Sequence, residues 1–249
     1  MPILGCENVT KRFGGLTALS NVSFTVEKRE LVGLIGPNGS GKTTLFNCIS
    51  GFYRSDKGKI TFYEKEITRL RPHTVCKLGI SRTFQLVRPF LDLTVMENVR
   101  LGRMFGRQQE KGTAHPRREL LEILELVGIA KLADSLVANL TTNDRKKLEL
   151  AKALAGTPRL LLLDEIITGL TPTEANEMVR LIQRIREEYV EAILMVEHIM
   201  RIIMNISDRV IVLNHGELIA QGTPAEIKQE QSVIEAYMGR GHVGIKEEG

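Results

Sequence analysis

The chain has 249 residues, a formal net charge of +4 and 43% hydrophobic residues, which suits one large domain or one domain with a lobe. Such a composition can bury a substantial core, and it excludes an intrinsically disordered chain. The mild basic bias allows contact with anions, including nucleotides, lipid head groups and nucleic acid, without choosing among them.

Cysteine usage and hydropathy set further limits. Cys6, Cys48 and Cys76 are widely spaced and odd in number, so they fit no disulfide or metal framework and predict reduced thiols of a cytosolic protein. Residues 1–7 contain no basic leader and no long apolar run, so we expect no secretory signal. Charges interrupt every long apolar stretch, and any membrane role would therefore come through a partner.

The first part of the chain predicts strands. Residues 22–26 alternate between apolar and polar side chains, as a half-buried strand does. Residues 31–35 form an apolar run that ends in a glycine-rich turn, the pattern of a buried strand. A further strand pair is expected around residues 56–59, ending in residues 60–62.

From about residue 94 to residue 155 the pattern becomes helical. Apolar side chains recur there at helical spacing, as in Leu120, Ile123, Leu124 and Val127. Residues 102–118 are polar and basic, which predicts a loop or a solvated helix end. The alternative for this stretch is a contact with a partner or with a membrane surface.

The last third of the chain returns to alternating strands and helices. Residues 160–163 and 192–196 predict buried strands on either side of an amphipathic helix at 175–185, and residues 209–220 predict a hairpin. Apolar strands that alternate with helices favour a mainly parallel sheet covered on both faces. The glycine-rich, charged tail at 241–249 is expected to fray.

The most specific motif is a glycine-rich loop between a predicted strand and a predicted helix. It fits the phosphate-loop pattern G-x-x-x-x-G-K-[ST] and, with the threonine that follows, comprises Gly36, Pro37, Asn38, Gly39, Ser40, Gly41, Lys42, Thr43 and Thr44. The glycines let backbone N–H groups converge on one point, where the helix N-terminus adds positive charge. Lys42 would contact the β- and γ-phosphates of a nucleotide, and the Thr43 hydroxyl would bind Mg²⁺.

Two acids, Asp164 and Glu165, follow directly after the apolar strand at 160–163. This places both at the carboxyl edge of the sheet, where open α/β sheets bind their ligands. Asp164 is suited to hold Mg²⁺, usually through water, and Glu165 to orient or deprotonate an attacking water. A solvent-facing acid pair is the simpler alternative, but the phosphate loop upstream favours a hydrolytic site.

The order of these motifs resembles that of the ATPase subunits of ABC transporters. In chain order they are an aromatic residue, the phosphate loop, a single Gln, a mid-chain signature, Asp-Glu after four leucines, and a His after a strand. This resemblance covers nearly the whole chain. Residues 11–16, 82–85, 196–198 and 222–224 are similar to the branched-chain amino-acid uptake (LivG-like) group of that family.

The resemblance implies an α/β fold, a P-loop NTPase with a mainly parallel central sheet, an antiparallel β subdomain and an inserted α-helical lobe. Residues 1–249 would form a single ABC ATPase domain. Within it, residues 1–85 and 156–240 would be the nucleotide-binding core, about 86–155 the helical lobe, and 241–249 the tail.

The resemblance also implies ATP and Mg²⁺ as cofactors and roles for three further residues. Phe13 would stack on adenine, Gln85 would sense Mg²⁺ and link the site to the lobe, and His198 would contact the γ-phosphate. The other histidines lie in polar, turn-like settings and are expected at the surface: His73, His115, His215 and His242.

The sequence departs from the family at the signature, which is Leu-Ser-Gly-Gly-Gln ahead of a helix. Here the segment is Leu140, Thr141, Thr142, Asn143 and Asp144. In the family two subunits pair head to tail, and the signature of one closes over the ATP of the other. Replacing both glycines adds bulk and Asp144 adds negative charge near an anion, so each change would weaken closure.

The residues after Glu165 also depart from the family. The usual Pro-Thr-Ala is replaced by Ile166, Ile167 and Thr168. Two hypotheses follow from these departures. In the first, the chain pairs with a different ATPase subunit, and its own ATP lies under that partner's signature; in the second, the altered signature still closes and both sites work. We favour the first.

The resemblance implies that ATP hydrolysis drives solute import through integral-membrane permease subunits. Branched-chain or other hydrophobic amino acids are the expected cargo, with amides or urea as alternatives. The other expected partners are a second ATPase subunit and, indirectly, an extracytoplasmic solute-binding protein. The chain would then lie at the cytoplasmic face of the inner or cell membrane. Residues 86–91 are a candidate for the permease contact, although they would serve equally well as lobe core.

Two other classes of function fit the sequence less well. A soluble ABC ATPase acting on nucleic acid or ribosomes usually carries two cassettes or a long coiled coil. This chain has one cassette and no sustained heptads, so no nucleic-acid partner is expected. A nucleotide-gated regulatory subunit with little turnover fits the altered signature, but Glu165 argues against it because a sensor needs no general base.

Overall fold

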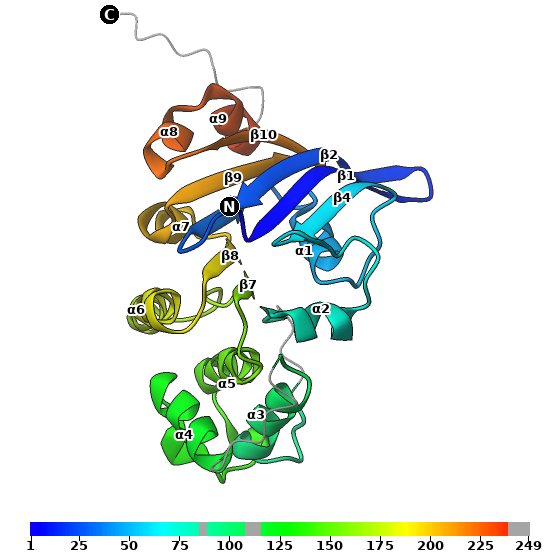
Figure 1. Ribbon diagram of the computed structural model, residues 1–249. Coiled ribbons are helices and arrows are strands. Elements are labelled where there is room, and N and C mark those ends of the chain that lie inside the picture. Colours follow the sequence, from blue (N-terminus) through cyan, green and yellow to red (C-terminus); the bar gives the residue numbers. More distant parts are fainter. Residues whose placement is uncertain (85–88, 108–115, 239–249) are drawn as a thin grey trace, which may run out of the picture.

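The computed structural model describes residues 1–84, 89–107 and 116–238, and its strands form two sheets (Figure 1). The smaller sheet is antiparallel and has the order β2-β1-β4-β5. Its strands are β1 (Leu4–Phe13), β2 (Leu16–Val26), β4 (Lys57–Phe62) and β5 (Lys65–Glu66).

The larger sheet has the order β10-β9-β3-β8-β7-β6. Its strands are β3 (Leu31–Ile35), β6 (Ile80–Arg82), β7 (Leu160–Asp164), β8 (Ala192–Val196), β9 (Arg209–Asn214) and β10 (Glu217–Gly222). The run from β9 to β6 is parallel, and β10 pairs antiparallel with β9 as the predicted hairpin. The mainly parallel central sheet and the antiparallel β subdomain are therefore confirmed.

Successive side chains of the parallel strands point to opposite faces of the sheet, and both faces are buried, so the sequences of these strands are apolar throughout. In β7, Leu161 and Leu163 face the core beneath the helices, whereas Leu160 and Leu162 face the core shared with the smaller sheet. All four side chains are fully buried. A strand covered on both faces has no solvent side, so its sequence contains no polar alternation.

The described residues form nine α-helices: α1 (Lys42–Ile49), α2 (Pro72–Leu78), α3 (Val95–Met104), α4 (Pro116–Leu126), α5 (Thr142–Ala155), α6 (Pro172–Glu188), α7 (Met200–Ile206), α8 (Pro224–Gln229) and α9 (Gln231–Met238). Two 3₁₀ turns, Ala130–Leu132 and Val137–Asn139, lie between α4 and α5. Figure 1 shows α6 and α7 on one side of the larger sheet and α1 on the other.

Helices α3, α4 and α5 gather at the end of the molecule away from α8 and α9 (Figure 1). They occupy the stretch expected for the helical lobe, while the division of the chain near residues 86 and 155 stays a prediction. The segment predicted as a loop or a solvated helix end at 102–118 contains helix ends on both sides, because α3 continues to Met104 and α4 begins at Pro116. The interior of that segment, 108–115, lies outside the described residues.

Three helices begin with the same capping box. Thr94, Thr171 and Thr223 each accept a hydrogen bond from the backbone N–H three residues later, and the glutamate at that later position bonds back to the threonine N–H. These caps satisfy backbone donors that the first helical turn leaves free. They therefore fix where α3, α6 and α8 start.

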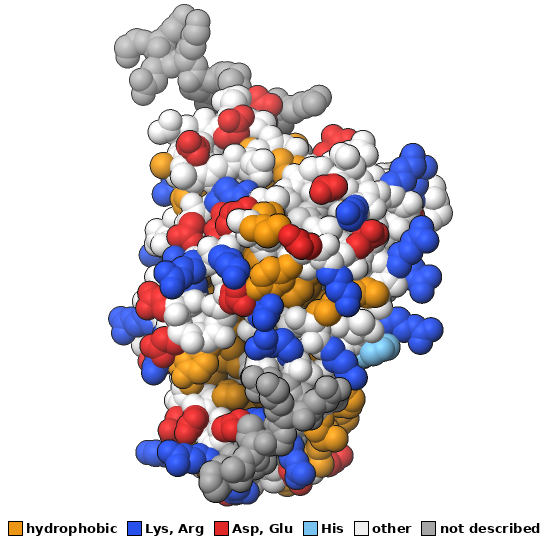
Figure 2. Space-filling view, viewed as in Figure 1, with side chains coloured by type: hydrophobic (Ala, Val, Ile, Leu, Met, Phe, Trp, Pro, Cys, Tyr) orange, Lys and Arg blue, Asp and Glu red, His pale blue; other side chains and the backbone are white. Residues whose placement is uncertain are grey.

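The surface shows side chains of both charges. In Figure 2, Lys and Arg lie interspersed with Asp and Glu, and hydrophobic side chains gather near the middle of the face.

All three cysteines are free thiols, as predicted. Among the described residues, no helix has the length and apolar character that crossing a membrane requires.

Candidate active site

The glycine-rich loop joins β3 to α1, as the strand–loop–helix pattern predicts. Its glycines are needed for steric reasons at two positions. Gly36 has φ +153°, and a Cβ there would lie 2.1 Å from the Leu213 carbonyl oxygen. Gly41 has φ +106°, and a Cβ there would lie 2.7 Å from the Ala18 carbonyl oxygen. Only glycine fits a backbone held this close to its neighbours.

Lys42 opens helix α1 and folds back over the loop. Its Nζ donates to the carbonyl oxygens of Gly36 at 2.8 Å and Pro37 at 2.9 Å, and only 6% of the residue is exposed. Burial lowers the pKa of Lys42, while the carboxylates of Glu165 and Asp164 oppose that change. The lysine is thus held at the centre of the loop, close to both acids.

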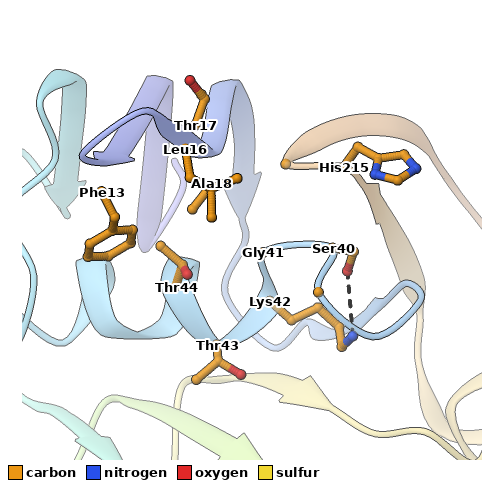
Figure 3. A pocket seen from close by; sticks show the side chains of 12 residues that line it. Phe13, Leu16, Thr17, Ala18, Ser40, Gly41, Lys42, Thr43, Thr44 and His215 are labelled. Carbon is orange, nitrogen blue, oxygen red and sulfur yellow. Dashed lines mark hydrogen bonds between the residues drawn. The ribbon is translucent and has the colours of Figure 1, made fainter.

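A cavity of about 520 Å³ lies in front of the loop (Figure 3). It is lined by Phe13, Leu16, Thr17, Ala18, Gly39, Ser40, Gly41, Lys42, Thr43, Thr44, His215 and Gly216. Figure 3 shows Phe13 beside α1 at one end and His215 at the other, with the loop between them. The cavity therefore brings the glycine-rich loop and an aromatic side chain together.

Phe13 is 42% exposed, which is unusual for a large aromatic side chain at the end of a strand. Its ring packs edge-on against Tyr53, with 5.2 Å between the ring centroids, and Lys11 Nζ lies 5.2 Å from its centroid. A ring held in place but open to the cavity is suited to stack on a planar base. Its predicted contact with adenine stays a prediction.

His215 is exposed, as predicted, but it also lines the cavity. It lies in the β9–β10 turn with φ +47°. The next residue, Gly216, donates its N–H to the Ser40 carbonyl at 3.0 Å, so the turn rests on the phosphate loop. Sequence reasoning missed this placement because the hairpin lies far along the chain from the loop.

Asp164 is the last residue of β7 and forms a buried ion pair. Arg82 Nη2 donates to Asp164 Oδ2 at 2.7 Å, and the two side chains are 6% and 2% exposed. Burial raises the pKa of Asp164, and the hydrogen bond from Arg82 opposes that rise. Asp164 Oδ1 is buried and has no hydrogen-bond partner among the described residues.

This arrangement fits a magnesium ion. A buried carboxylate oxygen without a donor is costly unless a cation or an ordered water meets it. Mg²⁺ binds through one or two carboxylates together with waters and substrate phosphates. Among the described residues, Asp164 Oδ1 and the Thr43 hydroxyl at the start of α1 are the predicted protein ligands.

Glu165 and His198 meet directly. Glu165 Oε1 lies 2.6 Å from His198 Nε2. The two residues follow the neighbouring parallel strands β7 and β8, which is why a separation of 33 residues closes into one contact. The side chain of Glu165 is 9% exposed and that of His198 is 39% exposed, so the pair lies at the open edge of the sheet. Gln85, the third predicted catalytic residue, lies outside the described residues.

Two residues that the sequence did not single out hold the loop after Glu165. Lys146 of α5 donates to the carbonyl oxygens of Ile166 at 2.9 Å and Glu165 at 3.4 Å, and also to that of Thr168. Burial lowers the pKa of Lys146, while the carboxylates of Glu197 and Glu165 oppose that change. A side chain of the signature helix is therefore bound to the backbone beside Glu165.

Glu197 secures the same loop from the other side. Its carboxylate accepts the Ile167 N–H at 2.6 Å and the Thr168 hydroxyl at 3.1 Å, and only 2% of Glu197 is exposed. Burial raises the pKa of Glu197, and these two hydrogen bonds oppose the rise. Glu197 lies between a buried strand and His198, and this position could have marked it as a residue of the site. No spacing rule, however, predicts that a carboxylate binds backbone groups.

The altered signature forms the start of α5. Thr141 is the N-cap: its Oγ1 accepts the Asp144 N–H at 3.2 Å and donates to Asp144 Oδ2 at 2.7 Å. Thr142 and Asn143 lie in the first helical turn. The carboxylate of Asp144 is therefore bound to its own helix cap.

The strand–loop–helix unit, the cavity in front of the loop and the acids at the edge of the parallel sheet define a P-loop nucleotide-binding domain. A family model described as ABC transporter matches residues 19–168. A second, described as branched-chain amino acid ATP-binding cassette transporter, matches residues 217–243. The chain belongs to the ABC transporter family of ATP-binding proteins, whose members bind nucleotide and hydrolyse ATP.

Several relatives match nearly the full length of the chain. The high-affinity branched-chain amino acid transport ATP-binding protein LivG of Salmonella typhimurium strain LT2 is 39% identical over 250 residues, covering 96% of this chain and 98% of its own. The corresponding protein BraF of Pseudomonas aeruginosa is 37% identical with the same coverage.

Solved structures agree with the fold. The ADP conformation of an ATP-binding cassette of an ABC transporter superposes with a TM-score of 0.87 at 31% identity, covering 96% of this chain and 99% of that one. A dimeric ATP-binding cassette bound to ADP and Pi superposes with a TM-score of 0.79 at 25% identity, covering 89% and 98%.

Proposed function

We propose that the chain hydrolyses ATP to drive solute import through a membrane permease, with branched-chain or other hydrophobic amino acids as cargo. The observation that supports hydrolysis best is the 2.6 Å contact between Glu165 and His198 at the same sheet edge as Asp164 and the phosphate loop. The names of the full-length relatives support the cargo.

In the proposed reaction, backbone N–H groups of the loop and Lys42 bind the β- and γ-phosphates of ATP, and Phe13 stacks on the adenine. Glu165 accepts a proton from, or orients, the water that attacks the γ-phosphorus, and the bond from this phosphorus to the β–γ bridging oxygen breaks, so that ADP leaves. His198 holds Glu165 in place and contacts the γ-phosphate. Thr43, Asp164 and Gln85 would hold Mg²⁺, which neutralises charge on the phosphate oxygens when bound.

ABC ATP-binding subunits of transport systems work with membrane permeases and dimerise. We propose that the permease contacts exposed apolar side chains at the two ends of α3. Phe90, Leu91 and Phe105 are 58%, 46% and 59% exposed, which disfavours the alternative that residues 90 and 91 are lobe core. Residues 86–88 of the same predicted contact lie outside the described residues.

Contact with a permease would place the chain at the cytoplasmic face of the cell membrane. An extracytoplasmic solute-binding protein would then be an indirect partner. The altered signature favours, as a second candidate, a nucleotide-gated regulatory subunit with little turnover.

The cargo is tested by uptake in cells that lack the chain and are supplied with either wild type or Lys42→Ala. We expect the wild type to restore accumulation of radiolabelled leucine, isoleucine and valine, and Lys42→Ala to restore none. Uptake of labelled urea or an aliphatic amide, with no effect on the amino acids, would reassign the cargo. Equal uptake with the two proteins would contradict a role for the phosphate loop in transport.

A further inference from the structure

Arg82 binds Asp164 of the candidate active site, and no sequence motif gives it a role. It is the last residue of β6, next to β7, and its side chain is 6% exposed. Nη2 donates to Asp164 Oδ2 at 2.7 Å. Nη1 donates to Asn47 Oδ1 at 2.6 Å and to Ser50 Oγ at 3.3 Å.

Two aromatic rings fix the plane of the guanidinium group. Arg82 Cζ lies 5.4 Å from the ring centroid of Phe46 and 5.2 Å from that of Phe84. Arginine is suited to this position because its planar group can stack on rings while its N–H groups bind at the edge. Phe46 and Asn47 belong to α1, so one side chain ties the helix of the phosphate loop to the strand that ends in Asp164.

The ion pair makes the two oxygens of Asp164 unequal. Oδ2 is bound to Arg82, whereas Oδ1 is buried with no hydrogen-bond partner among the described residues. A carboxylate that can rotate offers a cation both oxygens in many directions. A carboxylate fixed at one oxygen offers the other in a single direction, which favours the strict geometry of Mg²⁺.

We propose that Arg82 is a positioning residue that fixes Asp164 so that Oδ1 is the oxygen available to Mg²⁺, and thereby sets the Mg²⁺ affinity of the nucleotide complex. This proposal rests on the nucleotide site of the proposed function. Partners of metal ligands that do not touch the metal commonly change metal affinity by roughly 10- to 100-fold when removed.

The test compares wild type, Arg82→Met and Arg209→Met by calorimetric titration with ATP, first in EDTA and then over a series of Mg²⁺ concentrations. Arg209 is the matched control: it also binds a carboxylate, Glu30, at 2.7 Å, but it opens β9 at the opposite end of the parallel strands. Thermal unfolding of each variant establishes that it is folded.

For Arg82→Met we expect ATP affinity in EDTA to match wild type and the half-saturating Mg²⁺ concentration to rise roughly 10- to 100-fold. Arg209→Met should leave both quantities unchanged. An unchanged Mg²⁺ requirement in folded Arg82→Met would overturn the proposal. So would an equal loss of ATP affinity with and without Mg²⁺, because that would show a role in shaping α1 alone.

If Arg82→Met does not fold, Arg82→Lys is titrated with Mg²⁺ in its place. Lysine keeps the charge but cannot bind Asp164 and Asn47 together in one plane. Its Mg²⁺ requirement should rise several-fold, and an unchanged value would overturn the proposal. Failure of wild type to bind ATP at all would instead contradict the proposed function, which keeps the two outcomes apart.

Discussion

At the residue scale, the backbone of Glu165 has an unusual conformation. Its φ is +52°, in the left-handed region that a non-glycine residue adopts at a cost of roughly 1–2 kcal/mol. Such strain persists only where the surroundings hold it in place. Here Lys146 binds three carbonyl groups of the segment, and Glu197 binds the Ile167 N–H and the Thr168 hydroxyl. The general base proposed for hydrolysis is therefore positioned by residues that need not touch ATP.

Replacing Lys146 tests this positioning. In Lys146→Met the three carbonyl groups lose their common donor, so Glu165 should move from its contact with His198. We expect the rate of ATP hydrolysis to fall roughly 10- to 100-fold and ATP affinity to stay unchanged. Lys147→Met, one residue further along α5, is the control and should hydrolyse as wild type does. Unchanged hydrolysis in Lys146→Met would show that the loop holds its shape without this side chain.

At the element scale, the N-caps fix where helices begin, and α6 is the clearest case. Thr171 caps the helix, Pro172 follows in its first turn, and Glu174 completes the capping box. Helix α6 presents Ala175, Met178, Ile182 and Ile185 to the core under the larger sheet. Loss of the Thr171 cap should therefore affect stability without changing the phosphate loop or Asp164.

Thr171→Ala removes the side-chain acceptor for the Glu174 N–H. We expect the free energy of unfolding to fall by about 1 kcal/mol, the usual cost of losing such a cap. Thr173→Ala, at an exposed position in the same turn, should change it by less than about 0.5 kcal/mol. Equal effects of the two substitutions, measured by urea unfolding, would show that the cap contributes nothing.

The same cap predicts a dependence on pH. The Thr171 backbone N–H, followed by its hydroxyl, holds the pKa of Glu174 below the ordinary value of 4.5. A carboxyl with a lowered pKa in the folded state stabilises the protein above the unfolded-state pKa, and this contribution is lost as the pH falls through the folded-state pKa. Glu174→Gln should therefore lower the melting temperature at pH 7, and the difference from wild type should shrink below about pH 4.5. A difference that grows on acidification would contradict this sign.

Strands and helices with a clear pattern of apolar residues were predictable from the sequence, whereas several short helices were not. The strands at 160–163 and 192–196 were evident because burial on both faces leaves an unbroken apolar run. Helices α2, α8 and α9 have at most eight residues each, too few turns to show a helical period against their surroundings. Helix α8 begins with a capping box, whereas α2 has no side-chain cap, and all three helices pack against strands of the larger sheet.

The residues of the candidate site likewise divide into those that the sequence predicts and those that it does not. The phosphate loop, Asp164, Glu165 and His198 were predictable because each lies at a fixed distance from a recognisable strand. Arg82 and Lys146 act through contacts that span 82 and 20 residues, and no local spacing encodes such contacts. Their importance depends on the pairing of β6 with β7 and on the packing of α5.

At the scale of the whole molecule, the altered signature bears on how two subunits pair. Thr141 and Asp144 bind each other at the start of α5, and Thr142 and Asn143 fill the first turn where the family has two glycines. In a head-to-tail dimer this first turn would face the phosphates of the second subunit. This supports our proposal that the chain pairs with a different ATPase subunit.

Restoring the family signature tests the pairing. The variant Thr142→Gly, Asn143→Gly, Asp144→Gln removes the bulk and the negative charge together. With the chain as the only ATPase present, we expect it to hydrolyse ATP at least roughly tenfold faster than wild type and to form an ATP-dependent dimer in light scattering. Thr141→Ser alone, which keeps the cap, should change neither property. A wild-type chain that already dimerises on ATP and gains nothing from the change would favour two working sites.

The most direct test of the proposed hydrolysis is Mg²⁺-dependent release of phosphate from ATP by the chain assembled with its permease and partner subunit. Wild type is compared with Glu165→Gln, and ATP binding is measured for both. We predict that both bind ATP and that Glu165→Gln loses roughly 100-fold or more of the rate of this chain's site. Hydrolysis that survives unchanged in Glu165→Gln, while Lys42→Ala abolishes it, would contradict the assignment of Glu165 as the base.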